Sequence, residues 1–231
     1  MPIRILAYCL MPNHWHFVLW PETDDQVQEF MQWLTHTHTQ RWDVHCHTSG
    51  TGHMYQGRSK SFAVKRGLQL LLVLSYVERN ALRANRVGRA EDWIWGSLWR
   101  RQKQRGTAML SDWPVPRPAD WVDFVNESHT EQELEPLRRS VNRGCPFGQD
   151  YWQKATAVPL GLRWTPRPRG RSRKTTESQV NGIMSRFPFS QQYQTGQART
   201  STNTNEDDTT NAVRGTLLVH QTLLAHRLYQ R

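Results

Sequence analysis

The N-terminal part of the chain contains two short segments whose apolar pattern predicts strands. Residues 3–10 (IRILAYCL) form a continuous apolar run that is typical of a buried strand. Residues 14–20 (HWHFVLW) alternate with a period of two, so Trp15 and Phe17 face one side and His14 and His16 the other. Because only the turn residues Met11, Pro12 and Asn13 separate the two segments, we expect an antiparallel hairpin.

Two helices and a further strand are predicted next. Thr23 and Gln26 have the spacing of a capping box, and apolar residues at helical spacing follow them. This pattern predicts a helix over about 24–42. After a glycine-rich loop, a short strand near 61–64 precedes a second helix at about 67–84.

Beyond about residue 112 the sequence becomes richer in proline and polar residues. Thr130 is a good N-cap for a helix over 131–142. Residues 167–174 (RPRGRSRK) predict a flexible basic arm, and the Thr-, Asn- and Gln-rich stretch 178–211 predicts disorder. The pattern over 213–229 predicts a terminal helix.

Composition narrows the classes of partner. The 231 residues include 30 Lys and Arg against 20 Asp and Glu, and the formal net charge of +10 suits a polyanion. The apolar runs, such as Leu70 to Leu74, are far shorter than the roughly 20 residues of a membrane helix, so we expect no membrane partner. Three cysteines at scattered spacing do not suggest a disulfide framework, and we expect a reducing, cytoplasmic location.

Two histidines one residue apart on a strand can hold one metal ion between them. His14 and His16 project from the same face of the second predicted strand, so both rings can reach the same ion. The spacing alone is weak, because the chain has ten histidines, and two hydrogen-bonded structural histidines remain an alternative. A loop zinc site at His45-Cys46-His47, with His53 nearby, is a rival, although it lacks the ligand spacing of a zinc finger.

Tyr76 and Asn80 form the second candidate pair. Residues four apart on a helix lie on one face about one turn from each other. The tyrosine hydroxyl could therefore sit beside a metal ion whose coordination the Asn80 amide oxygen completes. A tyrosine near an apolar helix stripe is more often a core residue, and that alternative also remains open.

The two pairs occur within longer motifs that resemble a known family. MPNHWHFVLWPE, followed about sixty residues later by YVERNALRANRV, is similar to the signature of the tyrosine transposases associated with repetitive extragenic palindromes. These belong to the HUH superfamily of single-tyrosine insertion-sequence transposases. GHMYQGRSKSF resembles the strand between the two motifs, and SVNRGCPFG and RPRGRSRK resemble the C-terminal region of some members.

The resemblance implies roles for three of the candidate residues. His14 and His16 would be metal ligands and Tyr76 the nucleophile, and we add Asn80, four residues after Tyr76, as the candidate third ligand. Mixed nitrogen and oxygen ligands would permit Mg²⁺ or Mn²⁺. We also expect DNA phosphates to contact basic residues on the second helix and in the basic arm, namely Arg79, Arg83, Arg167, Arg169, Arg171, Arg173 and Lys174.

The implied enzyme is a metal-dependent DNA strand transferase. Attack by a tyrosine on a phosphodiester releases a 3′-hydroxyl and leaves a 5′-phosphotyrosine. Because the covalent link keeps the bond energy, rejoining needs no ATP, and the sequence contains no phosphate-binding loop of the GxxxxGK[ST] type. The expected partners are single-stranded or hairpin DNA, with a second copy of the chain in a homodimer as a further option.

The implied fold is α+β, an antiparallel sheet with helices packed on one side. Members of the family normally have a strand and a helix before the histidine strand, but only thirteen residues precede His14. We therefore expect an N-terminally truncated domain whose sheet lacks a central strand. The expected organisation is a catalytic domain at 1–112, a C-terminal extension at 113–166, and a basic arm with a largely disordered tail at 167–231.

Two other function classes are compatible with parts of the sequence. A truncated, non-catalytic DNA-binding remnant would fit the missing N-terminal elements, although all four chemical groups are present. A histidine-dependent nucleotide hydrolase fits less well, because the His-x-His-x-His pattern of such enzymes stops at Val18.

Overall fold

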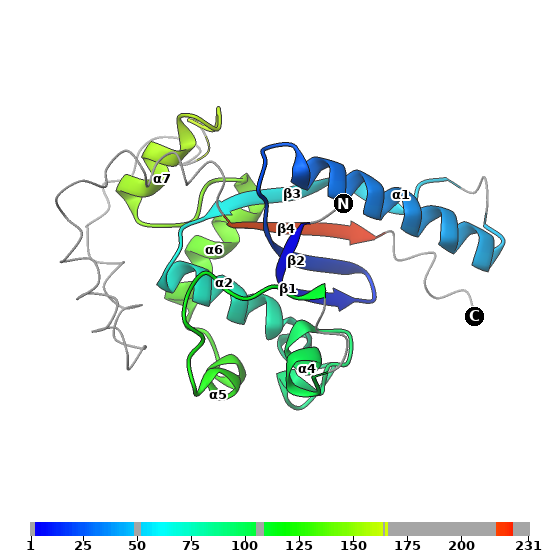
Figure 1. The fold of residues 1–231 in the computed structure, drawn as a ribbon, viewed down its shortest axis with the longest axis horizontal. Helices are drawn as coiled ribbons and strands as arrows, with labels where there is room; N and C mark the ends of the chain where they lie inside the picture. Colours follow the sequence, from blue (N-terminus) through cyan, green and yellow to red (C-terminus); the bar gives the residue numbers. More distant parts are fainter. Residues whose placement is uncertain (1–2, 49–51, 105–108, 164, 166–215, 224–231) are drawn as a thin grey trace.

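Four antiparallel strands form the central sheet of the computed structural model (Figure 1). The structure describes residues 3–48, 52–104, 109–163, 165 and 216–223. The strands, in chain order, are β1 (Arg4–Met11), β2 (His14–Trp20), β3 (Tyr55–Val64) and β4 (Thr216–Leu223). Their order across the sheet is β1-β2-β4-β3, so the strand that comes last in sequence lies inside the sheet.

Strand β4 corrects two expectations. It pairs with β2 on one side and with β3 on the other, so that Val219 lies opposite both Phe17 and Ser61. The helix predicted over 213–229 is therefore wrong for residues 216–223. The position inside the sheet that we expected to lack a strand is filled by β4. The physical reason is that β2 and β3 each present a row of backbone hydrogen-bonding groups that only another strand can pair.

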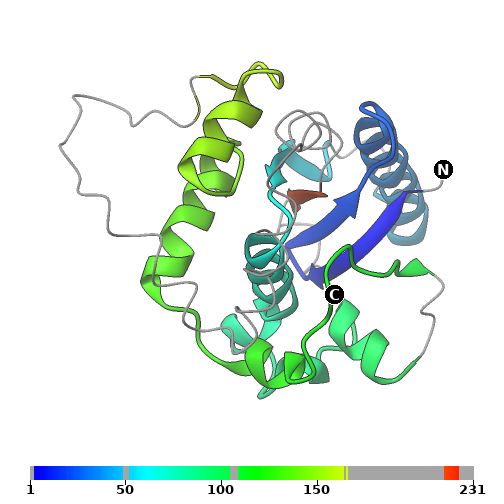
Figure 2. The same ribbon diagram turned by 60° about the vertical axis from the view of Figure 1, so that its left-hand side comes forward.

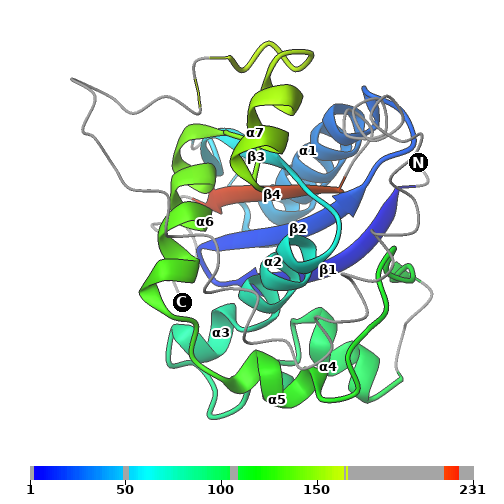
Figure 3. The same ribbon diagram turned by 90° about the vertical axis from the view of Figure 1, so that its left-hand side faces the viewer.

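Helices cover both faces of this sheet rather than one. The α+β class with an antiparallel sheet is confirmed, but α1 (Gln26–Cys46) lies on one face and α2 (Leu68–Glu78) on the other (Figure 3). The remaining helices are α3 (Asn80–Arg83), the 3₁₀ turn η1 (Ala90–Asp92), α4 (Ser97–Gln102), α5 (Trp121–Asn126), α6 (Glu131–Arg143) and α7 (Asp150–Ala157). No helix in the described part of the chain is long and apolar enough to cross a membrane.

The alternation in β2 explains why both faces are covered. Trp15, Phe17 and Leu19 pack with Phe30 and Met31 of α1 in one apolar cluster. The other face packs on α2, whose residues 70–74 are completely buried. A bulge in β1 between Ile5 and Ala7 turns both Leu6 and Ala7 toward the α2 side. The two sides of the sheet thus belong to two separate cores.

The free edge of β1 is covered by a later segment of the chain. The backbone N–H of Leu10 donates to the carbonyl of Trp95 at 3.0 Å, and that of Ser111 donates to the carbonyl of Ile5 at 2.9 Å. The indole N–H of Trp113 donates to the carbonyl of Leu6 at 2.9 Å. These contacts protect an edge that would otherwise be open to another strand.

The helix ends agree only partly with the predicted caps. Thr130 caps α6, and the Glu133 side chain accepts from the Thr130 backbone N–H, so a complete capping box confirms the predicted N-cap. The predicted box at the start of α1 is wrong, because α1 begins after Asp25 and the Gln26 side chain accepts from the Glu22 backbone N–H instead.

Residues of the C-terminal extension pack into the same core as α2. Trp121, Leu137 and Phe147 are buried in the cluster that contains the α2 leucines. Figure 2 shows α5 and α6 alongside the sheet and α2 rather than apart from them. The extension thus helps to fix the position of α2.

Candidate active site

Strand β2 and the segment from α2 to α3 bring the four predicted chemical residues together. The Nε2 atom of His14 lies 3.0 Å from Nδ2 of Asn80, and the His16 and Tyr76 rings meet edge to face at 5.9 Å between centroids. The two histidine rings are 5.1 Å apart. Both pairs therefore share one location on the α2 face of the sheet, as the alternation in β2 predicted.

The hydrogen bonds of His14 fix which of its ring nitrogens carries the proton. Asn80 Nδ2 can only donate, so Nε2 of His14 accepts. The other ring nitrogen, Nδ1, then carries the proton and donates to Oδ1 of Asn13 at 2.8 Å. Burial, and next the positive charge of Arg83, lower the pKa of His14 below its usual value. The ring is therefore held in the neutral state that a metal ligand requires.

Arg83 connects Asn80 with the tyrosine. Its guanidinium donates to Oδ1 of Asn80 at 2.9 Å and lies 5.1 Å from the centre of the Tyr76 ring. Arg83 is exposed, whereas Tyr76 is only 6% exposed and Asn80 1%. A cation at the solvent side of a buried tyrosine is well placed to meet a DNA phosphate that approaches the hydroxyl.

The side chains could hold a divalent ion only after a local rearrangement. His14 and His16 supply imidazole nitrogens on one face of β2, but the Nε2 lone pair of His14 accepts from the Asn80 amide, and a metal ion would have to displace this hydrogen bond. Asn80 presents its nitrogen to His14 and its oxygen to Arg83, so the amide oxygen would have to leave Arg83 to act as a third ligand. Such a mixed set of nitrogen and oxygen donors would permit Mg²⁺ or Mn²⁺.

The other predicted DNA-contacting residues lie elsewhere. The Arg79 guanidinium donates to the carbonyls of Val125 and Asn126 and to Oγ of Ser128, so it links the end of α2 to the end of α5. The basic arm residues Arg167, Arg169, Arg171, Arg173 and Lys174 lie outside the described residues.

Glu78 supports the site, although the sequence did not point to it. Its carboxylate is 2% exposed and accepts from Oγ of Ser97 at 2.6 Å and from the indole of Trp121 at 2.8 Å. Burial raises the pKa of this carboxyl. Since Glu78 lies between Tyr76 and Asn80, these bonds fix the rotation of the helical turn that carries both. A carboxylate at the end of the strongly apolar helix α2 was the signal that could have identified it.

The rival zinc site at His45, Cys46 and His47 does not form a ligand cluster. Cys46 ends α1 and His47 is its C-cap, in the left-handed conformation. Within the described parts of the chain, no three His, Cys, Asp or Glu side chains come together in a way that could hold a metal ion.

The N-terminal part of the chain matches a known family. The sequence model described as transposase IS200 like matches residues 1–80 of the 231. This part of the chain is similar to the IS200-like transposases. No curated protein and no solved structure matches the chain.

The segment that matches the IS200-like model contains all four residues proposed as metal ligands or nucleophile. It extends from the start of the chain to Asn80, and so includes the hairpin with His14 and His16 as well as Tyr76. This similarity supports a transposase-like function in DNA processing.

Proposed function

We propose that this chain cleaves and rejoins single-stranded, hairpin-forming DNA through a covalent link to Tyr76, with a divalent metal ion held by His14, His16 and Asn80. The observation that carries the proposal is the meeting of the two motifs, in which Asn80 contacts His14 and Tyr76 contacts His16. Each contact joins residues more than fifty positions apart, within a segment that matches a transposase family.

The chemistry assigns a separate role to each side chain. The Tyr76 oxygen forms a bond to phosphorus, the bond from phosphorus to the 3′ oxygen breaks, and the 3′ oxygen takes up a proton. A bound metal ion would polarise the scissile phosphate and offset its developing charge. Arg83 orients Asn80 and places a positive charge beside the Tyr76 ring. In the reverse reaction a 3′-hydroxyl attacks the phosphotyrosine and releases Tyr76.

Within the IS200-like family, the motifs support a narrower assignment. MPNHWHFVLWPE and YVERNALRANRV resemble those of the tyrosine transposases associated with repetitive extragenic palindromes. We therefore propose that the natural substrates are hairpins formed by palindromic repeats. Because none of this requires a nucleotide cofactor, ATP should have no effect on the reaction.

A non-catalytic DNA-binding protein is the second candidate. One observation favours it: the Asn80 oxygen accepts from Arg83, and only its nitrogen faces His14. A chain fixed in this arrangement would bind DNA without assembling the full ligand set.

A covalent-adduct assay separates the two candidates. Purified protein is incubated with labelled single-stranded hairpin DNA and Mn²⁺ or Mg²⁺, and the products are run on a denaturing gel. We expect a metal-dependent adduct that Tyr76→Phe abolishes and that Tyr151→Phe, a change at an exposed tyrosine of α7, leaves intact. Hairpin binding by folded protein without any adduct would support the non-catalytic candidate instead.

A further inference from the structure

Strand β4 brings a further histidine position next to His16. Its register with β2 sets His220 directly opposite His16, and Thr222 directly opposite His14. Directly opposed residues of an antiparallel pair belong to the same face of a sheet, with Cβ atoms about 5 Å apart. The backbone register of β4 therefore places His220 on the α2 face of the sheet, beside the two histidines of the candidate active site.

The alternation along β4 leads to the same face. Val219, the residue before His220, is completely buried in the apolar cluster beneath α1. Successive residues of a strand belong to opposite faces of the sheet, so position 220 belongs to the α2 face. The strand pairing and the burial of Val219 thus agree on the place of His220.

The row of paired residues that contains His16 and His220 extends across the whole sheet. In order from β1 to β3 it consists of Cys9, His16, His220 and Lys60. Cys9 at one end is completely buried in the core that contains α2, whereas Lys60 at the other end is exposed. An ion can therefore approach the row from the β3 side, where His220 is the histidine position nearest to the exposed end.

Two imidazoles do not complete the coordination of a divalent ion. Catalytic zinc-type sites commonly use three protein ligands and keep a further position open for water or substrate. The rings of His14 and His16 lie 5.1 Å apart, and the Asn80 oxygen accepts from Arg83. An imidazole from position 220 would bring the set to three protein ligands even before the Asn80 oxygen leaves Arg83.

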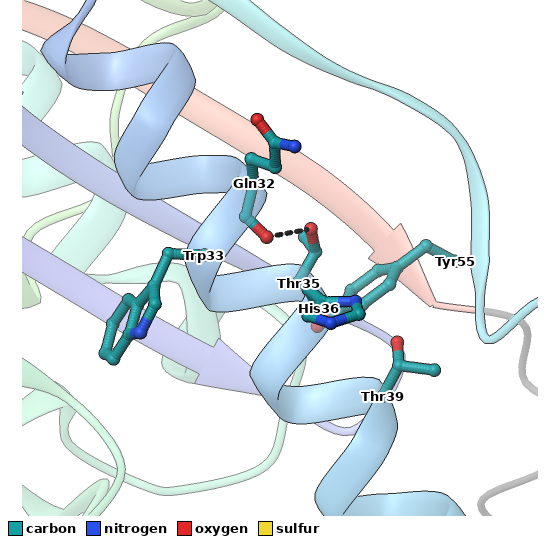
Figure 4. Close-up of a pocket in the computed structure, with 6 residues that line it drawn as sticks. All are labelled: Gln32, Trp33, Thr35, His36, Thr39 and Tyr55. Carbon is teal, nitrogen blue, oxygen red and sulfur yellow. Dashed lines mark hydrogen bonds between the residues drawn. The ribbon is translucent and has the colours of Figure 1, made fainter.

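The pocket on the α1 face offers no comparable site among its described side chains. Figure 4 shows the residues of α1 and β3 that line it, which are Gln32, Trp33, Thr35, His36, Thr39 and Tyr55. His36 is the single imidazole among these six, and no carboxylate or thiol accompanies it. Because one imidazole does not make a metal site, the comparison favours the α2 face.

We propose that His220 is a further ligand of the divalent ion that the proposed function assigns to His14 and His16. The inference rests on that metal site, but not on the reaction at Tyr76. Three imidazoles favour ions such as Co²⁺ or Zn²⁺ over Mg²⁺, which prefers oxygen ligands. His220 lies outside residues 1–80, so this ligand comes from a strand that the IS200-like match does not include.

Metal titrations of the full chain test the assignment. Co²⁺ and Mg²⁺ affinities are measured by calorimetry for the wild type, for His220→Gln and for His53→Gln, a matched change at an exposed histidine before β3. We expect His220→Gln to lower the Co²⁺ affinity about tenfold or more and to change the Mg²⁺ affinity by less than about twofold. His53→Gln should match the wild type for both ions.

A spectroscopic measurement keeps the test independent of how well the variants fold. Because β4 lies inside the sheet, urea denaturation is recorded for each variant, and His220→Val, which keeps a good strand former, accompanies His220→Gln. Electron paramagnetic resonance of the chain with one equivalent of Cu²⁺ then reports the imidazole nitrogens bound to the ion. The unaltered chain should show one such nitrogen more than either His220 variant, and His53→Gln should show no loss.

The outcomes separate this inference from the proposed function. A wild-type spectrum with nitrogens from only two imidazoles would overturn the role of His220 without any variant, as would wild-type Co²⁺ affinity in both His220 variants. An adduct at Tyr76 together with either of these results would leave the proposed reaction standing. A missing Tyr76 adduct alongside a Co²⁺ affinity that depends on His220 would refute the reaction and keep the ligand.

Discussion

Asn80 connects the two motifs, because it contacts His14 of β2 and Arg83 of α3 through opposite ends of one amide. Asn80→Ala removes the proposed third ligand and leaves Arg83 without this acceptor. We expect Mn²⁺ affinity, measured by calorimetry, to fall about tenfold or more. Asn142→Ala, an exposed change on α6, is the control. Equal Mn²⁺ affinities in the two variants would exclude Asn80 as a ligand.

His38 should make the stability of the fold depend on pH. Burial lowers the pKa of His38, so the unfolded chain, with a pKa of about 6.5, takes up this proton more readily than the folded protein. Stability is therefore unaffected by this group above that value, and is lost as the pH falls from about 6.5 toward the lower folded pKa.

The measurement is urea denaturation between about pH 7.5 and 5. Wild-type protein should lose stability on acidification more steeply than His38→Gln. His36→Gln, an exposed change on the same helix, should follow the wild type. If His36→Gln flattened the pH dependence as much as His38→Gln does, the assignment to His38 would be wrong.

At the residue level, the sequence predicted what depends on local geometry. The shared face of His14 and His16 follows from the period of a strand, and the structure has both rings on that face. The sequence did not predict that the Arg79 guanidinium would donate hydrogen bonds to the carbonyls of Val125 and Asn126. Those acceptors are about 46 residues away in sequence, and only the tertiary fold brings them to α2.

At the scale of elements, the local sequence predicted β1, β2, α1, α2 and α6, but it did not predict β4. The first five have clear apolar periods or caps and occur close to their predicted positions, although α2 ends at Glu78 and α3 follows it. The segment at Thr216–Leu223 has no such decisive pattern. Its strand conformation is imposed by the two unpaired edges between which it lies.

Strand β4 should therefore be essential for the stability of the sheet. Val219 is completely buried in the cluster beneath α1, and Val219→Asp would place an unpaired carboxylate there. We expect the free energy of unfolding, measured by urea denaturation, to fall by about 3 kcal/mol or more. Val44→Asp, at a largely exposed position of α1, should change it by less than about 0.5 kcal/mol. Similar losses in both variants would mean that β4 does not hold the sheet together.

At the scale of the whole molecule, the sheet separates two kinds of surface. Its α2 face carries the histidines and the tyrosine, and its α1 face carries a cavity lined by both Arg58 and Asp24. The formal net charge of +10 favours polyanionic partners for the molecule as a whole. At the edge of the sheet, residues 56–61 of β3 are exposed and include Arg58 and Lys60.

The place of β4 also bears on how the protein is made. A ribosome releases β2 and β3 long before Thr216 is synthesised, and until then β3 and the edge of β2 that faces away from β1 lack their partner strand. During that interval the nascent chain exposes two strand edges and the apolar surface that Val219 later covers. The sheet is complete only after translation has passed residue 223, so a chain that stopped before Thr216 would keep both edges open to other strands.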